Sequence, residues 1–282
     1  MGELRLTHHS TAQAFLARAQ DWLMAAEPEH NLILGICERL INRPDGYQGK
    51  PYLVTVEDGG SVVAAVAMTP PYKLVLARVL QVEALGLLAE DLIEAHLYPP
   101  GVLGPKTEAQ VFARLWRAMT GIGTVSIEAE AISEVRQVVH PAYSGSHLRP
   151  ARFDELDVLT RWRISFMVEV GLQEEIEARR SATQDLLERG GLYVWDDAGL
   201  VSVAATNRST PHGVCIGFIY TPPPLRKHGY GTSCVAALSQ QILDSGREFC
   251  CLFTRLADAT SNDIYQKVGY RRVADWVDVF FE

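Results

Sequence analysis

Apolar positions change their spacing several times along the first half of the chain. Between residues 11 and 42 they recur at three- and four-residue steps, which predicts helix, and Pro28 divides it in two. Residues 52–57 and 61–68 are β-rich runs that flank Asp58-Gly59-Gly60, so they predict an antiparallel hairpin. The remaining pattern predicts a strand over 74–80, a helix over 82–96, a short strand within 99–105, a helix over 106–119 and a strand over 124–132.

A similar order of elements returns in the second half. A strand near residues 149–154 precedes two helices over 155–170 and 174–188, and then a hairpin over 191–195 and 200–206. The pattern then predicts a strand over 214–220, a helix ending near Gly246, a strand over 248–254 and a closing strand over 273–281. Since 282 residues suit two domains, we expect one over residues 1–145 and one over 146–282, joined near residues 141–150, which include the flexible run Ser144-Gly145-Ser146.

Composition narrows the class of partner. The net charge of −8 and pI near 5.5 argue against nucleic-acid and membrane-surface binding, which normally use a basic face. No stretch approaches the roughly 20 apolar residues of a membrane span, and the first nine residues lack a signal-peptide profile. We therefore expect a cytoplasmic protein with a small-molecule partner, while the oligomeric state stays open.

The cysteines predict no metal site and no disulfide framework. There are five, none in a C-x-x-C pair or a short His/Cys cluster. Buried free thiols are expected.

The stretch with the clearest chemistry follows the strand over 214–220. Three prolines, 222–224, remove the amides that would extend a sheet ladder, so the chain must leave the sheet there. Glycines in the next turn allow close backbone approach to a ligand, and the helix beyond offers unpaired amides that favour phosphate or diphosphate. The turn reads Arg226-Lys227-His228-Gly229-Tyr230-Gly231-Thr232, and its first three residues add positive charge.

Spacing separates this turn from other phosphate-binding loops. A Walker loop needs four residues between its glycines and a Lys-Ser/Thr pair, and a Rossmann turn needs a third glycine where Cys234 stands. What remains is R-x-x-G-x-G between a strand and a helix. This resembles motif A of the GNAT superfamily of acyl-CoA-dependent N-acetyltransferases, in which the turn holds the diphosphate of coenzyme A.

A second segment adds to the resemblance. Residues 262–270 are similar to the family segment that closes the fold, with Asn262 and Tyr265 at the matching polar positions. The resemblance implies that Asn262 lines the coenzyme site and that Tyr265 is the general acid for the departing thiolate. A phenol, with an ordinary pKa near 10, suits that role. The alternative is that Tyr265 is only a packing aromatic.

The resemblance also implies the fold. It is α/β of the α+β type, with tandem GNAT folds, each a mixed, mostly antiparallel sheet flanked by helices. The turn after residues 99–105 lacks R-x-x-G-x-G, so residues 1–145 are interpreted as a degenerate copy without acyl-CoA binding. In the second copy the central strand is expected to splay from its neighbour, so that Phe218, Ile219 and Tyr220 receive the coenzyme.

The implied activity is transfer of an acetyl group from acetyl-CoA, as co-substrate and without a metal, to a primary amine of a small acceptor. The general base is open: Glu169, Glu174, Glu175 and His212 are candidates, although glutamates at a helix end are more often solvated. The polar residues around Pro28 form either a pocket or, as we favour, a solvated turn: Glu27, Glu29, His30 and Asn31. Two alternatives to a transferase remain, a non-catalytic acyl-CoA sensor and a nucleotide- or phosphate-binding protein.

Overall fold

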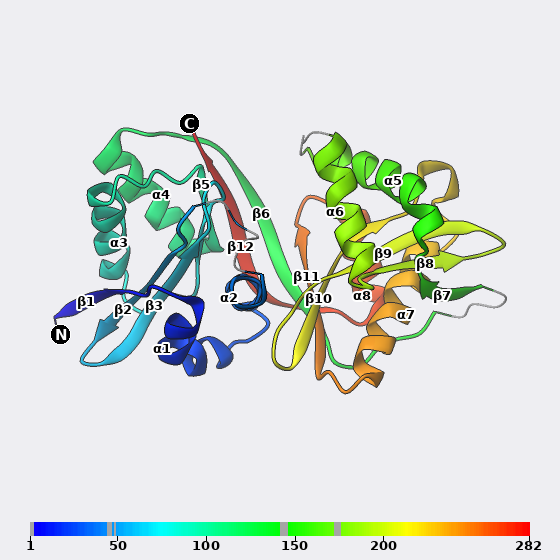
Figure 1. Ribbon diagram of the computed structural model, residues 1–282, viewed down its shortest axis with the longest axis horizontal. Coiled ribbons are helices and arrows are strands. Elements are labelled where there is room, and N and C mark those ends of the chain that lie inside the picture. The colour runs from blue at the N-terminus through cyan, green and yellow to red at the C-terminus, as the bar shows by residue number, and fades with distance from the viewer. Residues whose placement is uncertain (1–2, 44–46, 48, 142–145, 172–175) are drawn as a thin grey trace. The chain divides into compact units, whose positions relative to one another are not determined.

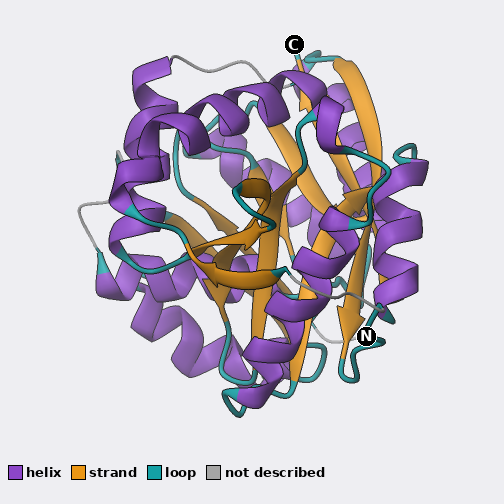
Figure 2. Cartoon of the chain, turned by 90° about the vertical axis from the view of Figure 1, so that its right-hand side faces the viewer, coloured by secondary structure: helices purple, strands orange, loops and turns teal. Residues whose placement is uncertain are grey.

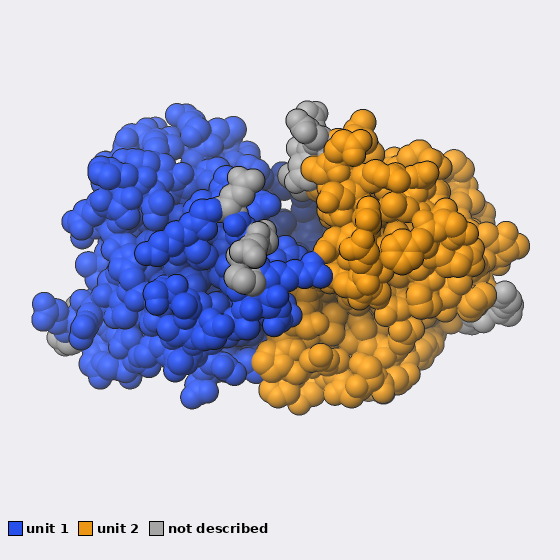
Figure 3. Space-filling view, in the orientation of Figure 1, with its two compact units in different colours: residues 1–133, 253–257, 272–282 blue, residues 134–252, 258–271 orange. Residues whose placement is uncertain are grey.

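The structure is a computed structural model that describes residues 3–43, 47, 49–141, 146–171 and 176–282. It forms two compact units, coloured separately in Figure 3. Unit 1 comprises residues 1–133, 253–257 and 272–282, and unit 2 comprises residues 134–252 and 258–271. Residues 142–145 of the expected joint lie outside the described residues.

Unit 1 contains seven strands and four helices among its described residues, labelled in Figure 1. Its sheet order is β1-β2-β3-β4-β5-β12-β6. The strands are β1 Leu4–His8, β2 Tyr52–Asp58, β3 Ser61–Met68, β4 Leu74–Leu76, β5 Gly101–Pro105, β6 Thr124–Val135 and β12 Arg271–Phe281. The helices are α1 Ala12–Met24, α2 Asn31–Asn42, α3 Glu83–Glu94 and α4 Lys106–Thr120.

Local chemistry explains where several of these elements begin and turn. Thr11 caps α1, because its hydroxyl accepts a hydrogen bond from the Ala14 amide at 3.1 Å. Gly59 and Gly60 adopt φ of 55° and 83°, which makes the tight turn of the β2–β3 hairpin. The hairpin predicted from these glycines is therefore present, whereas the pattern gave no indication of β1.

The last strand of the chain lies in unit 1. β12 pairs antiparallel with β5, from Trp276 opposite Pro105 to Phe280 opposite Gly101, and β6 flanks its other edge (Figure 1). Lys73, which precedes β4, also bonds Asp278 of β12 at 2.5 Å. The prediction that residues 273–281 close the sheet of the second domain is therefore wrong. Alternation predicts a strand but carries no information about which edge it pairs with.

Unit 2 repeats the connectivity of unit 1. Its strands run in the order β7-β8-β9-β10-β11. The strands are β7 His147–Pro150, β8 Leu192–Asp196, β9 Leu200–Ser209, β10 Gly213–Tyr220 and β11 Phe249–Arg255, of which residues 253–255 cluster with unit 1. The helices are α5 Leu156–Glu169, α6 Ile176–Glu188, α7 Tyr230–Asp244 and α8 Ala259–Val268, with 3₁₀ turns at Phe153–Glu155 and Pro223–Leu225.

Helices cover both faces of the strands, as Figure 2 shows. In unit 2, α7 and α8 pack on one apolar cluster that includes Ile216 and Val268, while α5 and α6 pack on another that includes Phe218 and Val203. Antiparallel pairing predominates, as in β1–β2 and β8–β9, while β4–β5 and β10–β11 are parallel. The predicted fold class, with a mixed, mostly antiparallel sheet in each copy, is confirmed.

The other composition-based expectations concern thiols and membranes. All five cysteines are free and buried, as predicted. No helix in the described ranges is long and apolar enough to cross a bilayer. Within the same ranges, no three His, Cys, Asp or Glu side chains gather as metal ligands would.

The place of β12 predicts which unit a core change in this strand weakens. Val279 is fully buried in the unit 1 core, so Val279→Ala should lower the free energy of unfolding by about 2 kcal/mol. In hydrogen exchange, the amides of β5 should lose protection, whereas the amides of β9 should exchange as slowly as in the wild type. Val273→Ala, in the same strand but 37% exposed, is the control and should cost less than about 0.5 kcal/mol. Equal loss of protection at β5 and β9 would contradict the assignment of β12 to unit 1.

Candidate functional site

The central strands of unit 2 part from each other. β10 and β11 run parallel and pair from Gly213 opposite Phe249 to Cys215 opposite Cys251, and within the described residues their register ends there. β10 itself continues to Tyr220, held on its other side by β9. The second half of β10 therefore has one edge that β11 does not pair with, as the sequence interpretation expected.

A β-bulge lies in that second half of β10. Gly217 pairs with Ala205 and Tyr220 with Val203, so three steps along β10 match two along β9. Phe218 adopts a left-handed φ of 45°, which is uncommon for a bulky residue. Ile216 faces the α7 side of the sheet, whereas Phe218 faces the α5 side, although the two would share a face in a regular strand. The bulge thus reorients the backbone next to the unpaired edge.

The turn after β10 has the geometry of an anion site. Lys227 and Gly229 adopt φ of 68° and 80°, and Gly229 is the residue before α7. The first amides of a helix have no intrahelical partner and favour negative charge. No side chain caps this helix start. Residues 226–229 are exposed, so a ligand can reach these amides.

One buried hydroxyl in the first turn of α7 fits the same interpretation. Ser233 is 2% exposed, and its Oγ has no hydrogen-bond partner among the described residues. Gly231 allows close packing, because a Cβ there would lie 3.3 Å from the Thr221 hydroxyl. These features suit the diphosphate and pantetheine arm of coenzyme A, for which residues 218–220 and 226–232 were predicted as the binding residues.

Arg226 departs from the expectation that it adds charge at the diphosphate. Its Nη2 donates to both carboxylate oxygens of Glu169 at 2.8 Å, and its Nε donates to the Thr221 carbonyl at 2.8 Å. Its guanidinium also lies 5.5 Å from the centre of the Tyr220 ring. Arg226 is thus directed toward helix α5 and the end of β10.

Two neighbouring turn residues also make contacts within unit 2. The Tyr230 hydroxyl donates to Asp197 at 2.6 Å, which ties the start of α7 to the β8–β9 hairpin. The His228 ring stacks on Tyr230, with 5.6 Å between ring centres, and its Nδ1 lies 3.3 Å from the Leu225 carbonyl. These contacts leave the backbone of the turn, the exposed side chain of Lys227 and Thr232 at the end of the motif for a ligand.

Helix α8 carries Asn262 and Tyr265. Asp258 caps this helix through the Ser261 amide, and Asn262 Nδ2 donates to the Asp258 carbonyl at 2.7 Å. Tyr265 is 9% exposed, and burial is the main cause that raises the pKa of its phenol, with the charges of Asp258 and Cys215 acting in the same direction. The phenol is therefore protonated at neutral pH, as a general acid must be.

The candidate bases fare differently. Glu169 is occupied by Arg226. Glu174 and Glu175 lie outside the described residues. His212 precedes β10 at the end opposite the bulge, about 20 Å from Phe218 at the usual rise per strand residue, so the structure does not bring it to the site.

Connectivity corrects the counterpart of the motif turn in unit 1. The order β10-α7-β11-α8 corresponds to β4-α3-β5-α4, so the counterpart of residues 221–229 is the segment 77–82 between β4 and α3. The turn after residues 99–105, which the sequence suggested, corresponds instead to the turn after β11. The segment 77–82 reads Ala-Arg-Val-Leu-Gln-Val and has no glycine. Unit 1 therefore lacks the motif, as predicted, but the segment that lacks it is residues 77–82 and not the turn after residues 99–105.

A histidine occupies the strand edge of unit 1 at this position. β4 pairs with β5 at Leu74 and Val75. Beyond them the Ala77 amide donates to β3, and the next amide, of Arg78, donates to His30 Nε2 at 3.3 Å. Because successive amides of an extended chain point to opposite edges, the Arg78 amide faces the side away from β3. The His30 side chain thus accepts a hydrogen bond from the strand edge of unit 1 that corresponds to the β10 edge left unpaired by β11 in unit 2.

His30 is held as a neutral ring. Its Nδ1 lies 2.8 Å from the Leu23 carbonyl, so Nδ1 carries the proton and Nε2 accepts from Arg78. Trp22 stacks on the ring at 5.2 Å, and His30 is 2% exposed. The preferred interpretation of this region as a solvated turn is therefore wrong, since Glu27 and Asn31 are buried as well.

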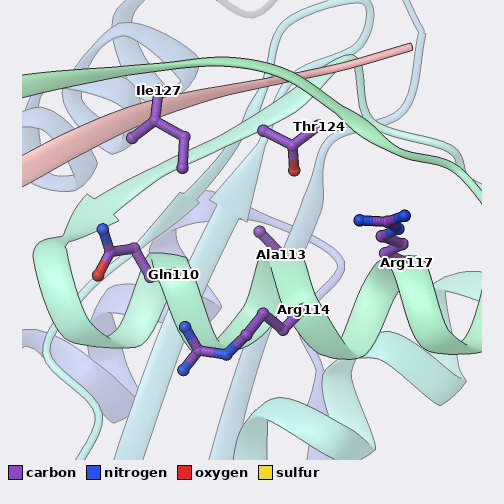
Figure 4. A pocket seen from close by; sticks show the side chains of 6 residues that line it. All are labelled: Gln110, Ala113, Arg114, Arg117, Thr124 and Ile127. Carbon is purple, nitrogen blue, oxygen red and sulfur yellow. The ribbon is translucent and has the colours of Figure 1, made fainter.

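A cavity of about 210 Å³ lies in unit 1 between α4 and β6 (Figure 4). Its lining residues are Gln110, Ala113, Arg114, Arg117, Thr124 and Ile127. None of them belongs to the motif turn, the open edge of β10 or α8. The cavity is therefore separate from the candidate site, which is an open strand edge and an exposed turn.

Comparisons with known proteins agree with the geometry. Residues 197–279 match the family model described as FR47-like protein. No curated protein matches the sequence. The fold is similar to a GCN5-related N-acetyltransferase from Sphaerobacter thermophilus, with TM-score 0.62 and 15% identity over 99% of this chain and 95% of that one. It is also similar to a GNAT-family acetyltransferase from Colwellia psychrerythraea. The TM-score is 0.60 and the sequence identity 10%, over 99% of this chain and 100% of that one. A tandem GNAT protein from the clavulanic acid biosynthesis pathway has a TM-score of 0.57 and a sequence identity of 13%, over 98% of each chain.

The role of His30 predicts a pH dependence of stability. Burial is the main cause that lowers its pKa, followed by the charge of Arg78, while the Leu23 carbonyl acts in the opposite direction. The unfolded chain therefore binds a proton more readily, starting near its ordinary pKa of about 6.5. Stability should be constant above about pH 7.5 and should fall by about 1 kcal/mol as the pH drops from there to about pH 5.5.

Urea unfolding across this pH range measures the effect. His30→Gln removes the titration and should have the flatter profile, whereas His140→Gln, at an exposed histidine, should follow the wild type. Equal losses in the wild type and His30→Gln would contradict a neutral buried ring.

Proposed function

We propose that the chain is a member of the GNAT superfamily and that unit 2 transfers an acetyl group from acetyl-CoA to a primary amine of a small acceptor. The observation that carries the proposal is the open, bulged edge of β10, which leads directly into an uncapped helix start. A strand edge can pair with the amides of pantetheine, and the helix start can hold a diphosphate. The two halves of coenzyme A thus find adjacent partners in the chain.

The coenzyme would be held mainly by backbone. In the proposed complex the amides of residues 228–232 bind the diphosphate, Phe218 to Tyr220 receive the pantetheine arm, and Asn262 lines the site from α8. The coenzyme brings the activated thioester, and the chain supplies its orientation.

The reaction would be a direct attack. The neutral amine nitrogen attacks the thioester carbonyl, and a backbone amide near the bulge stabilises the oxyanion. The carbon–sulfur bond then breaks, and the thiolate takes the proton of the Tyr265 phenol, which regains a proton from solvent. The amine proton leaves to water, because the described glutamate nearest to the turn, Glu169, is paired with Arg226.

Unit 1 is proposed to bind no coenzyme. Its turn at residues 77–82 has no glycine, and its strand edge bonds His30. Each chain would therefore bind one coenzyme molecule. The acidic net charge of −8 supports a small amine as acceptor and argues against nucleic acid.

One observation favours a second candidate, a non-catalytic acyl-CoA sensor. Of the candidate bases within the described residues, Glu169 is paired with Arg226 and His212 lies before the far end of β10. A sensor would bind coenzyme A but release no thiol with any amine, whereas a transferase releases the thiol with at least one. A panel of small amines with acetyl-CoA, assayed for free thiol, separates the two.

Coenzyme binding is tested by changing the charge of the helix start. Gly229→Asp places a carboxylate where the diphosphate is expected, and it should weaken coenzyme A binding by about 100-fold in titration calorimetry. Gly229→Asn imposes the same backbone strain without the charge, so its affinity for coenzyme A should fall much less. The wild type should bind one molecule per chain. No binding by the wild type, or equal losses in the two variants, would overturn the site.

The role of Tyr265 gives a separate prediction. Tyr265→Phe keeps the buried ring and removes the proton donor, so coenzyme affinity should persist while turnover falls by roughly 10²-fold. Turnover is measured with whichever amine the panel identifies. An unchanged rate would leave Tyr265 as a packing residue, and Tyr270→Phe, another buried phenol of the same cluster, serves as the control.

A further inference from the structure

Arg226 makes contacts that differ from those expected of a diphosphate ligand. Its Nη2 is bonded to both oxygens of Glu169, and its Nε to the Thr221 carbonyl. A paired carboxylate neutralises the charge that an anion would use. The side chain is therefore committed to the protein and not to a ligand at the amides of residues 228–232.

Glu169 stands at the end of a row of contacts between α5 and β10. Trp162 lies 6.2 Å from the Tyr220 ring and Phe166 lies 5.6 Å from the Phe218 ring. Trp162, Phe166 and Glu169 are spaced by four and three residues and so share one face of α5. This face of α5 thus contacts Phe218 and Tyr220 at the bulge, and its Glu169 contacts Arg226 in the turn.

The Thr221 bond completes the arrangement. Thr221 is the first residue after β10, and its carbonyl fixes the start of the proline segment against Arg226. Its hydroxyl lies 2.9 Å from that of Ser202, whose Oγ also donates to the Tyr220 carbonyl at 3.1 Å. The end of the open strand edge is thus fixed from β9 and from Arg226.

We propose that Arg226, with Glu169, Thr221 and Tyr220, forms a clamp that positions the bulged end of β10 for the pantetheine arm. In this role Arg226 is a positioning residue and not a diphosphate ligand. The inference rests on the proposed function, because it concerns how the same site receives its coenzyme. Both members of the ion pair are exposed, 40% for Arg226 and 44% for Glu169, so the clamp contributes little to global stability.

The two roles of Arg226 predict opposite effects of Glu169→Gln. If Arg226 is a clamp, loss of the carboxylate releases it and weakens coenzyme A binding, by about 10-fold for one charge-assisted pair. If Arg226 serves the diphosphate, loss of the competing carboxylate frees the guanidinium and strengthens binding. Arg226→Lys separates the roles again, because lysine keeps the charge but cannot bridge Glu169 and Thr221 as a planar fork does.

The experiment measures dissociation constants by titration calorimetry for coenzyme A and for 3′-phospho-ADP, its nucleotide half with the diphosphate. A clamp predicts that Glu169→Gln and Arg226→Lys each weaken coenzyme A by about 10-fold and leave 3′-phospho-ADP unchanged. A merely structural loss would weaken both ligands together. Thermal unfolding of each variant should stay close to that of the wild type.

A control lies on the same helix. Asp157 of α5 pairs with Arg180 of α6, away from the turn, so Asp157→Asn removes a similar exposed ion pair and should change neither affinity. Unchanged or tighter coenzyme A binding by Glu169→Gln overturns the clamp and leaves the proposed function intact. Absence of coenzyme A binding by the wild type overturns the proposed function itself.

Discussion

The parting of two parallel strands after Cys215 and Cys251 is the constraint on which the candidate site depends. A parallel ladder satisfies the amides of both strands, so a strand that leaves its neighbour must place those amides against something else. In unit 2 the bulge at Phe218 and the proline segment direct the chain away from the ladder, and the glycine turn then begins α7. The edge and the helix start arise from the same departure, which is why they lie next to each other.

The two units resolve the same constraint in different ways. Unit 2 leaves its edge and turn open, while unit 1 gives the corresponding amide of Arg78 to the buried ring of His30. Burial of an imidazole requires it to stay neutral and hydrogen-bonded, and both of its nitrogens have partners. A repeated connectivity therefore does not imply a repeated ligand. The two units differ in whether a side chain of the protein, such as His30 in unit 1, accepts the hydrogen bond of the strand edge.

The sequence predicted those features that depend on neighbouring residues. The hairpin at Gly59-Gly60 and the helix start after Gly229 follow from local conformation, and so does the break at the three prolines. The features it missed depend on distant residues. Glu169 lies 57 positions from Arg226, the strand that β12 pairs with lies far back in the chain, and His30 reaches Arg78 across 48 positions. Local patterns specify which element forms, while packing decides what it touches.

The position of β12 bears on how the protein is made. Unit 1 is translated first, yet Val277, Val279 and Phe281 of its core are supplied by residues at the other end of the chain. During synthesis the edge of β5 stays unpaired until those residues leave the ribosome, and an unpaired apolar edge invites wrong pairing. The core of unit 1 is thus completed only after unit 2 has been synthesised, and a chain that stops before β12 would expose the edge of β5 to aggregation and to quality-control proteases.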